Sequence, residues 1–210
     1  DAKARSPEEL KAMQDALTGQ FPTLADFERD FPSLCFALAT GVGKTRLMGA
    51  FISYLHAAYG YKHFFVLAPN LTIYDKLIGD FSPNSPKYVF KGIAEFASTP
   101  PEVITGDNYE QRGSRSLLGG IEVNIFNISK INSEVRGGKS PKIKRLSEYL
   151  GQSYFEYLAG LDDLVLIMDE SHRYRASAGI RSLNELRPLL GLELTATPFV
   201  EGTGGRTTPF

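Results

Sequence analysis

The segment Gly41-Val42-Gly43-Lys44-Thr45 combines two glycines, a lysine and a threonine at the spacing of a phosphate-binding loop. The two glycines let the backbone curl so that consecutive N–H groups point at an anion. A helix that begins near Lys44 adds its positive end. We expect Lys44 to reach the β- and γ-phosphates of a nucleotide and Thr45 to hold Mg²⁺. Leu38 stands where the full phosphate-loop pattern has glycine, and a chance glycine-rich turn is the alternative interpretation.

A second pair of chemical residues, Asp169 and Glu170, follows the apolar run 164–168. Acidic side chains at the end of a buried strand cost desolvation energy unless a cation or water meets them. In a phosphate-loop enzyme the strand-end aspartate holds Mg²⁺, and Glu170 would polarise the attacking water. An acidic helix cap would look similar. The joint occurrence with Gly-Lys-Thr favours two halves of one phosphoryl-transfer site.

Predicted strands and helices alternate along the chain and set the positions of these residues. The pattern predicts strands at 34–38, 63–68, 88–90, 103–104, 121–128, 164–168 and 192–197. It predicts helices at 6–18, 44–59, 142–150, 153–160 and 179–189. It also predicts a helix that Asn70 or Thr72 caps and that carries Ile73, Leu77 and Ile78. Ser6 and Glu9 form a capping box for the first helix. Because continuous apolar strands alternate with helices, we expect an α/β fold with a mainly parallel sheet.

Composition and charge limit the kinds of partner and location that the chain can have. The 210 residues carry a net charge of −1, so no global field attracts nucleic acid. The basic stretch 136–145 is either a DNA-backbone contact or a solvated loop. Cys35 is expected in the core, and His56 and His63 are expected to pack without a ligand set. No apolar run approaches the length of a membrane span, and the lone cysteine suits the cytoplasm.

Five segments, in their order along the chain, carry a resemblance to a known family. These are 39–45 (ATGVGKT), 67–73 (LAPNLTI), 126–132 (FNISKIN), 168–176 (MDESHRYRA) and 194–199 (LTATPF). The chain resembles the first motor domain of superfamily 2 helicases. In its finer features it is similar to the restriction (Res) subunit of Type III restriction-modification enzymes. Asp-Glu-Ser-His departs by one hydroxyl from the more frequent Asp-Glu-Ala-His.

The resemblance implies a RecA-like phosphate-loop domain at 33–200, after a helical lead-in at 1–32 and before the start of a linker at 201–210. It implies ATP and Mg²⁺ as cofactors. The nucleotide-binding residues would be Thr40, Gly41, Val42, Gly43, Lys44, Thr45 and Arg46. Gln14 would read the adenine edge, although a solvated glutamine is the plainer interpretation. Asp169 would hold Mg²⁺, and Glu170 would act on the water.

The same resemblance implies coupling and DNA-contact residues. His172 would link the γ-phosphate region to Thr195 and Thr197. The DNA contacts would be Pro69, Asn70, Ser129 and Lys130. Contact with the backbone lets a motor move without reading sequence.

The implied partners are double-stranded DNA, a methyltransferase subunit that recognises the site, and second RecA-like and nuclease domains of a longer chain. Because the second motor domain supplies an arginine finger, we expect the 210 residues alone to bind nucleotide weakly and hydrolyse it poorly. Two alternatives stay open at this point. One is a superfamily 2 helicase of the repair type, and the other is a nucleotide-gated module without turnover.

Overall fold

The computed structural model describes residues 6–22, 27, 29–109, 119–127, 154–171, 183–197, 199–201 and 207–209. Its helices are α1 (Pro7–Thr18), α2 (Lys44–Tyr59), α3 (Leu71–Phe81), α4 (Ala94–Ser98) and α9 (Tyr154–Gly160). Its strands are β1 (Ser33–Ala37), β2 (His63–Ala68), β3 (Glu102–Thr105), β4 (Glu122–Asn127), β5 (Leu164–Asp169), β6 (Leu190–Thr195), β7 (Phe199–Glu201) and β8 (Thr207–Pro209).

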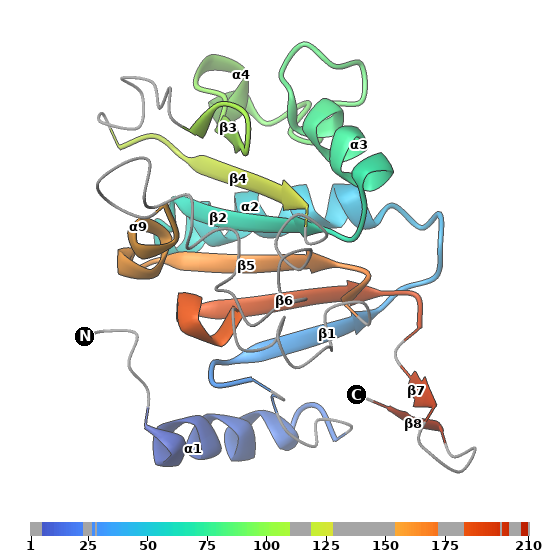
Figure 1. The fold of residues 1–210 in the computed structure, drawn as a ribbon, viewed down its shortest axis with the longest axis vertical. Helices are drawn as coiled ribbons and strands as arrows, with labels where there is room; N and C mark the ends of the chain where they lie inside the picture. Colours follow the sequence, from blue (N-terminus) through green and yellow to red (C-terminus); the bar gives the residue numbers. More distant parts are fainter. Residues whose placement is uncertain are drawn as a thin grey trace, which may run out of the picture.

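Six of the strands form one sheet in the order β1-β6-β5-β2-β4-β3 (Figure 1). Every neighbouring pair in this sheet is parallel. The carboxyl ends of all six strands therefore meet at one edge of the sheet. β5 and β6 lie between β1 and β2 in space, although β2 follows β1 along the chain. The predicted parallel α/β fold is confirmed.

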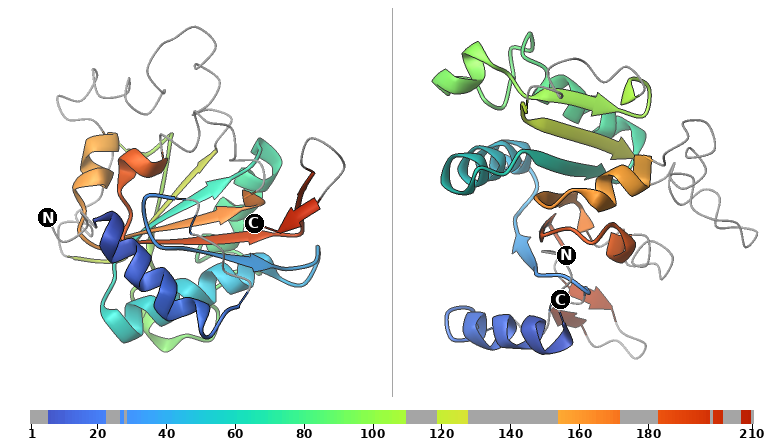
Figure 2. Two further views of the ribbon diagram at one scale, coloured as in Figure 1. Left: turned by 90° about the horizontal axis from the view of Figure 1, so that it is seen from below. Right: turned by 90° about the vertical axis from the view of Figure 1, so that its left-hand side faces the viewer.

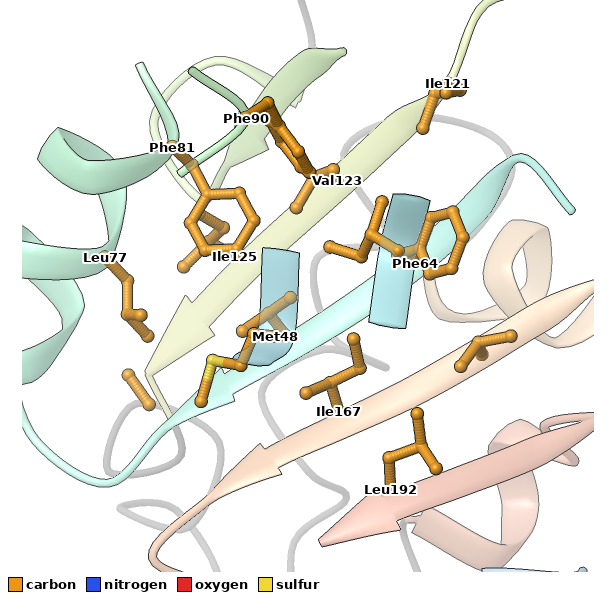
Figure 3. Packing of buried hydrophobic residues seen from close by; sticks show 14 of the residues in the cluster. Met48, Phe64, Leu77, Phe81, Phe90, Ile121, Val123, Ile125, Ile167 and Leu192 are labelled. Atoms are coloured by element: carbon orange, nitrogen blue, oxygen red, sulfur yellow. The ribbon is translucent and has the colours of Figure 1, made fainter. Parts of the chain in front are cut away.

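Side chains of alternate strand residues build a core on each face of the sheet, which is why the strands read as continuous apolar runs. α2 and α9 lie on opposite sides of the sheet (Figure 2). Figure 3 shows the core on the side of α2 and α3. Its buried members include Met48, Phe64, Leu77, Phe81, Val123, Ile125, Ile167 and Leu192. The core beneath α9 includes Phe65, Leu67, Tyr154, Leu158, Leu166 and Met168.

Local signals set the helix ends where the sequence predicts them. Ser6 Oγ accepts from the Glu9 N–H at 3.1 Å, and Glu9 Oε2 accepts from the Ser6 N–H at 2.7 Å, which completes the capping box. α2 ends at Gly60, whose φ of 74° is left-handed. Asn70 Oδ1 caps α3 by accepting from the Ile73 N–H at 2.9 Å.

Two predictions about the fold are wrong. Residues 88–90 form turns, in which the Lys91 N–H bonds to the Tyr88 carbonyl, and not a strand. Tyr88 and Phe90 bury their rings in edge-to-face contact, so packing and not a ladder explains their apolar character. Cys35 is exposed, because β1 is the edge strand of the sheet.

The remaining helices and strands agree with the predicted ones in part. The short helix α4 and the antiparallel β7–β8 pair were not expected. The helix at 153–160 is confirmed as α9, and the last strand of the sheet spans 190–195. The expected helix at 179–189 is helical at 183–186, and its earlier part lies outside the described residues. Segments 128–153 and 172–182 lie outside them too, and with them the basic stretch 136–145 and the helix at 142–150.

Candidate nucleotide-binding site

The phosphate-loop segment connects β1 to α2 at the carboxyl edge of the sheet. Gly41 and Gly43 have φ values of 82° and 95°, in the left-handed region that favours glycine. Gly43 is the N-cap of α2 and forms no side-chain cap hydrogen bond. The first N–H groups of α2 therefore face the loop without a side-chain acceptor, as an anion site requires.

The loop entry explains why Leu38 replaces glycine. The Leu38 side chain packs against the core on the α2 side of the sheet. Its N–H donates to the Thr195 carbonyl at 2.8 Å, which continues the β1–β6 pairing by one residue. The leucine at position 38 thus contributes to core packing. The two glycines nearest the helix, Gly41 and Gly43, match the motif.

Lys44 and Glu170, 126 residues apart in sequence, form an ion pair in the structure. Lys44 Nζ donates to Glu170 Oε1, and the two side chains are 11% and 21% exposed. Glu170 has a φ of 51°, which is uncommon for a residue with a side chain. Such backbone strain gathers at functional sites. The structure therefore brings the phosphate-loop lysine to the residue predicted to act on water.

Asp169 ends β5 as a buried carboxylate. The residue is 7% exposed, and its Oδ1 finds no hydrogen-bond partner among the described residues. Burial raises the pKa of Asp169 above its ordinary value, the Lys44 ammonium acts against this rise, and the Glu170 carboxylate adds to it. A buried carboxylate oxygen without a donor suits a cation as its partner.

Thr45 lies at the start of α2, and its hydroxyl oxygen accepts a hydrogen bond from Lys76 Nζ at 2.9 Å. The same ammonium donates to Asp80 Oδ2 at 2.7 Å, one helical turn further along α3. Sequence reasoning missed both α3 residues, since a lysine four residues before an aspartate is an ordinary pair on a helix surface. Their position beside the phosphate loop follows from the parallel sheet alone.

Thr195 and Thr197 lie beside the same ion pair. The Thr197 N–H donates to Thr195 Oγ1 at 3.1 Å, and the two hydroxyl oxygens are 3.5 Å apart. The Ala196 N–H between them donates to Glu170 Oε2 at 3.5 Å. The predicted coupling threonines therefore lie next to Glu170, at the carboxyl end of β6.

The remaining predicted site residues are more scattered. Thr40 and Val42 are exposed in the loop, and Arg46 is in the first turn of α2. Pro69 and Asn70 follow β2 at the same edge of the sheet. Gln14 lies on α1, a helix with no buried residue, and its carbonyl accepts from Thr18 Oγ1. Ser129, Lys130 and His172 lie outside the described residues.

A profile of the family described as "Type III restriction enzyme, res subunit" matches residues 8–200. The chain belongs to this family. The Res-subunit assignment confirms the predicted resemblance to a superfamily 2 helicase motor domain with a RecA-like fold, and it makes a repair helicase the less suitable interpretation.

Two individual proteins are similar to this member of the Res-subunit family. The probable type III restriction-modification enzyme HindVIP Res subunit of Haemophilus influenzae is 27% identical over 168 residues, covering 75% of this chain and 29% of that protein. A nuclease-deletion mutant of the Type ISP restriction-modification enzyme LlaGI, in complex with a DNA substrate mimic, matches with a TM-score of 0.45 and 16% identity. That match covers 94% of this chain and 18% of the solved chain. The chain thus spans less than a third of the curated Res subunit.

The described ranges lack a membrane-spanning helix and a cluster of metal-ligating side chains. No helix in them is long and apolar enough to cross a membrane. They contain no group of three or more His, Cys, Asp or Glu residues placed to hold a metal ion. This finding is compatible with the predicted magnesium site, since Mg²⁺ bound with a nucleotide uses one or two carboxylates together with phosphate oxygens.

Proposed function

We propose that this chain binds ATP with Mg²⁺ and hydrolyses ATP as the first motor domain of a Res subunit that moves on double-stranded DNA before cleavage. The observation that carries the proposal is the meeting of Lys44, Glu170 and Asp169 at the carboxyl edge of the sheet. Lys44 follows β1 at the start of α2, and Asp169 and Glu170 lie at the end of β5, with β6 between these two strands. We place the motor domain at 33–200, with 1–32 as its lead-in.

The residues present fit Mg²⁺ and a nucleotide. The left-handed glycines and the uncapped start of α2 suit phosphate oxygens, and the unpartnered Asp169 oxygen suits a cation. Thr45 and Asp169 would hold Mg²⁺, and Lys44 would bind the phosphates. Bound Mg²⁺·ATP supplies the phosphoanhydride bond that is broken and a cation that neutralises charge developing on the phosphates.

The chain's own residues would divide the remaining work. Glu170 is a carboxylate at the mouth of the site, where it can accept a proton from water. In the structure it holds Lys44, so the lysine must exchange this carboxylate for a phosphate when nucleotide enters. The Ala196 N–H keeps the other Glu170 oxygen near the Thr195–Thr197 segment. This contact offers a physical route for the proposed coupling, to which His172 would add.

Partners and DNA contacts belong to the same proposal. Pro69 and Asn70, together with Ser129 and Lys130, would touch the DNA backbone. A methyltransferase subunit would recognise the site, while second RecA-like and nuclease domains would complete the Res subunit. Efficient turnover would need those further domains.

Binding of a fluorescent ATP analogue with and without Mg²⁺ tests the core of the proposal. We expect Lys44→Ala to weaken binding by about tenfold or more, because a charge-assisted phosphate contact is lost. The exposed Lys91 serves as the matched control, and Lys91→Ala should bind as the wild type does. Equal binding by wild type and Lys44→Ala would rule out this phosphate site.

A second variant separates an ATPase from a nucleotide-gated module. Glu170→Gln should retain binding of the analogue but lower ATP hydrolysis in the complete Res subunit with DNA, by at least about a hundredfold. A non-hydrolysing module would show the same negligible turnover for both proteins.

A further inference from the structure

The α3 residue Lys76 places an ammonium group against Thr45, one of the two proposed magnesium ligands. Its Nζ lies 2.9 Å from Thr45 Oγ1 and 2.7 Å from Asp80 Oδ2. Burial raises the pKa of the Asp169 carboxyl, and the charges of Lys44 and Lys76 both act against this rise. Lys76 thus contacts one side chain that the proposed function assigns to Mg²⁺, Thr45, and acts electrostatically on the other, Asp169.

We propose that Lys76 is a positioning residue that competes with Mg²⁺ for the Thr45 hydroxyl, with Asp80 as the anchor that keeps the ammonium when the ion binds. This inference rests on the proposed function and deepens it. Mg²⁺ binds an oxygen ligand at about 2.0–2.1 Å, and the oxygen must offer a lone pair to the ion. An ammonium that donates to the same oxygen uses a lone pair and repels the ion at short range.

Lys76 and Asp80 differ in how far their side chains are buried. The Asp80 side chain is 11% exposed and the Lys76 side chain 50% exposed. The carboxylate is therefore fixed in α3, while the lysine head is solvated enough to move. When Mg²⁺ takes the Thr45 oxygen, Lys76 keeps its bond within α3. Because the Lys76–Thr45 bond joins α3 to the start of α2, magnesium binding would release a link to the helix that Asn70 caps.

The test measures the Mg²⁺ concentration that gives half-maximal binding of a fluorescent ATP analogue to the full chain. Lys76→Met keeps the length of the side chain without its charge. We expect it to lower this midpoint by about three- to fivefold, the scale of a partly exposed charge interaction. Lys76→Arg should stay near the wild-type midpoint, and the exposed Lys91→Met should leave it unchanged. An unchanged or raised midpoint in Lys76→Met would overturn the inference.

A double variant removes the chief competing explanation. In Lys76→Met the Asp80 carboxylate loses its partner and could attract Mg²⁺ by itself. Lys76→Met/Asp80→Asn is neutral at both positions, so its midpoint should remain lowered if Lys76 competes at Thr45. A return to the wild-type midpoint would show that Lys76 acts only by neutralising Asp80.

Failure of the proposed function gives a different pattern of results. If the wild type binds no nucleotide, or binds it as Lys44→Ala does, the proposed function and this inference both fall. If Lys44→Ala loses binding while Lys76→Met keeps the wild-type midpoint, only the inference falls. Far-UV circular dichroism of each variant confirms that the helices are intact.

Discussion

Asp163 and Asp169 are two carboxylates at opposite ends of β5, and burial acts on both. Burial favours the protonated form of Asp163, but the His63 ring and the Lys62 N–H, 2.7 Å from Oδ2, together lower the pKa of this carboxyl below its ordinary value. Asp169 Oδ1 has no such donor among the described residues, and burial raises its pKa. At the residue scale, one carboxylate is a structural partner and the other is available to a cation.

The two aspartates predict opposite dependences of stability on pH. The folded-state pKa of Asp163 is depressed, so its contribution is present above 3.8 and is lost as pH falls through the folded value. The folded-state pKa of Asp169 is raised, so stability is lost as pH rises from 3.8 through the folded value.

Urea denaturation at pH 7 without nucleotide or Mg²⁺ tests this contrast. Asp169→Asn should raise the free energy of unfolding by about 1 kcal/mol, because it removes a buried charge whose Oδ1 has no hydrogen-bond donor among the described residues. Asp163→Asn should lower it by about 1–3 kcal/mol, because donors lose a charged acceptor. The Asp169 difference should shrink as the pH falls through the raised folded-state pKa of this carboxyl toward 3.8. The Asp163 difference should shrink as the pH falls below 3.8. Destabilisation of similar size by both variants would contradict the assignment of Asp169 to a cation.

At the scale of the element, α2 and α3 differ in the residue that caps their first turn. Asn70 satisfies the start of α3 with its own side chain, and α3 is closed to an anion there. Gly43 leaves the start of α2 without a side-chain cap and adopts a left-handed conformation. The difference follows from residue type, since glycine has neither a capping group nor a Cβ that would resist a positive φ.

Gly43→Ala and Gly79→Ala form a matched pair of variants on these helices. Gly43→Ala forces a side chain into φ of 95° and should lower the free energy of unfolding by about 1–2 kcal/mol. It should also weaken binding of the ATP analogue. Gly79 lies inside α3 with nothing within 4 Å of an added Cβ, so alanine there should stabilise by about 0.5–1 kcal/mol. Thermal unfolding and analogue binding measure both effects, and equal nucleotide binding by the two variants would argue against the loop geometry.

At the scale of the whole molecule, a buried ion pair holds the segment before β1 to β6, the strand next to the edge of the sheet. Arg29 Nε donates to Glu193 Oε1 at 3.1 Å, with side chains 2% and 6% exposed. Ser33 Oγ donates to the same oxygen at 3.0 Å. Glu193 lies opposite Cys35 on β1 and Met168 on β5, two residues before Thr195. The pair therefore fixes the edge strand β1, which leads into the phosphate loop, against β6.

Removal of one partner of the Arg29–Glu193 pair should lower the free energy of unfolding more than replacement of both partners by apolar residues. Glu193→Leu alone leaves Arg29 buried without its partner and should lower the free energy of unfolding by about 3–5 kcal/mol. Arg29→Met/Glu193→Leu removes both charges and should recover most of that loss. Urea denaturation of the three variants, including Arg29→Met, forms a double-mutant cycle. Simple addition of the two single losses in the double variant would disprove the coupling.

The sequence alone determined the elements whose signals are local. The capping box at Ser6, the end of the helix 44–59 and the strand at 63–68 follow from neighbouring residues and are predicted from them. Asn70 is one of two predicted caps of α3, and the structure selects it over Thr72. Lys44 and Asp169 were also found from sequence, because a phosphate loop and an acidic strand end have fixed local patterns. Residues 88–90 were misassigned, since bulky apolar residues pack equally well in turns.

Which of these residues come into contact depends on the order of the strands in the sheet. The insertion of β6 and β5 between β1 and β2 brings Glu170 to Lys44 and places Ala196, which follows β6, beside Glu170. Lys76, Asp80 and the Arg29–Glu193 pair depend on the same long-range arrangement, and no local pattern encodes their partners. The edge position of β1 likewise left Cys35 exposed despite its apolar run. Local structure follows from short-range hydrogen bonding and periodicity, whereas the contacts of the site follow from the order in which strands pair.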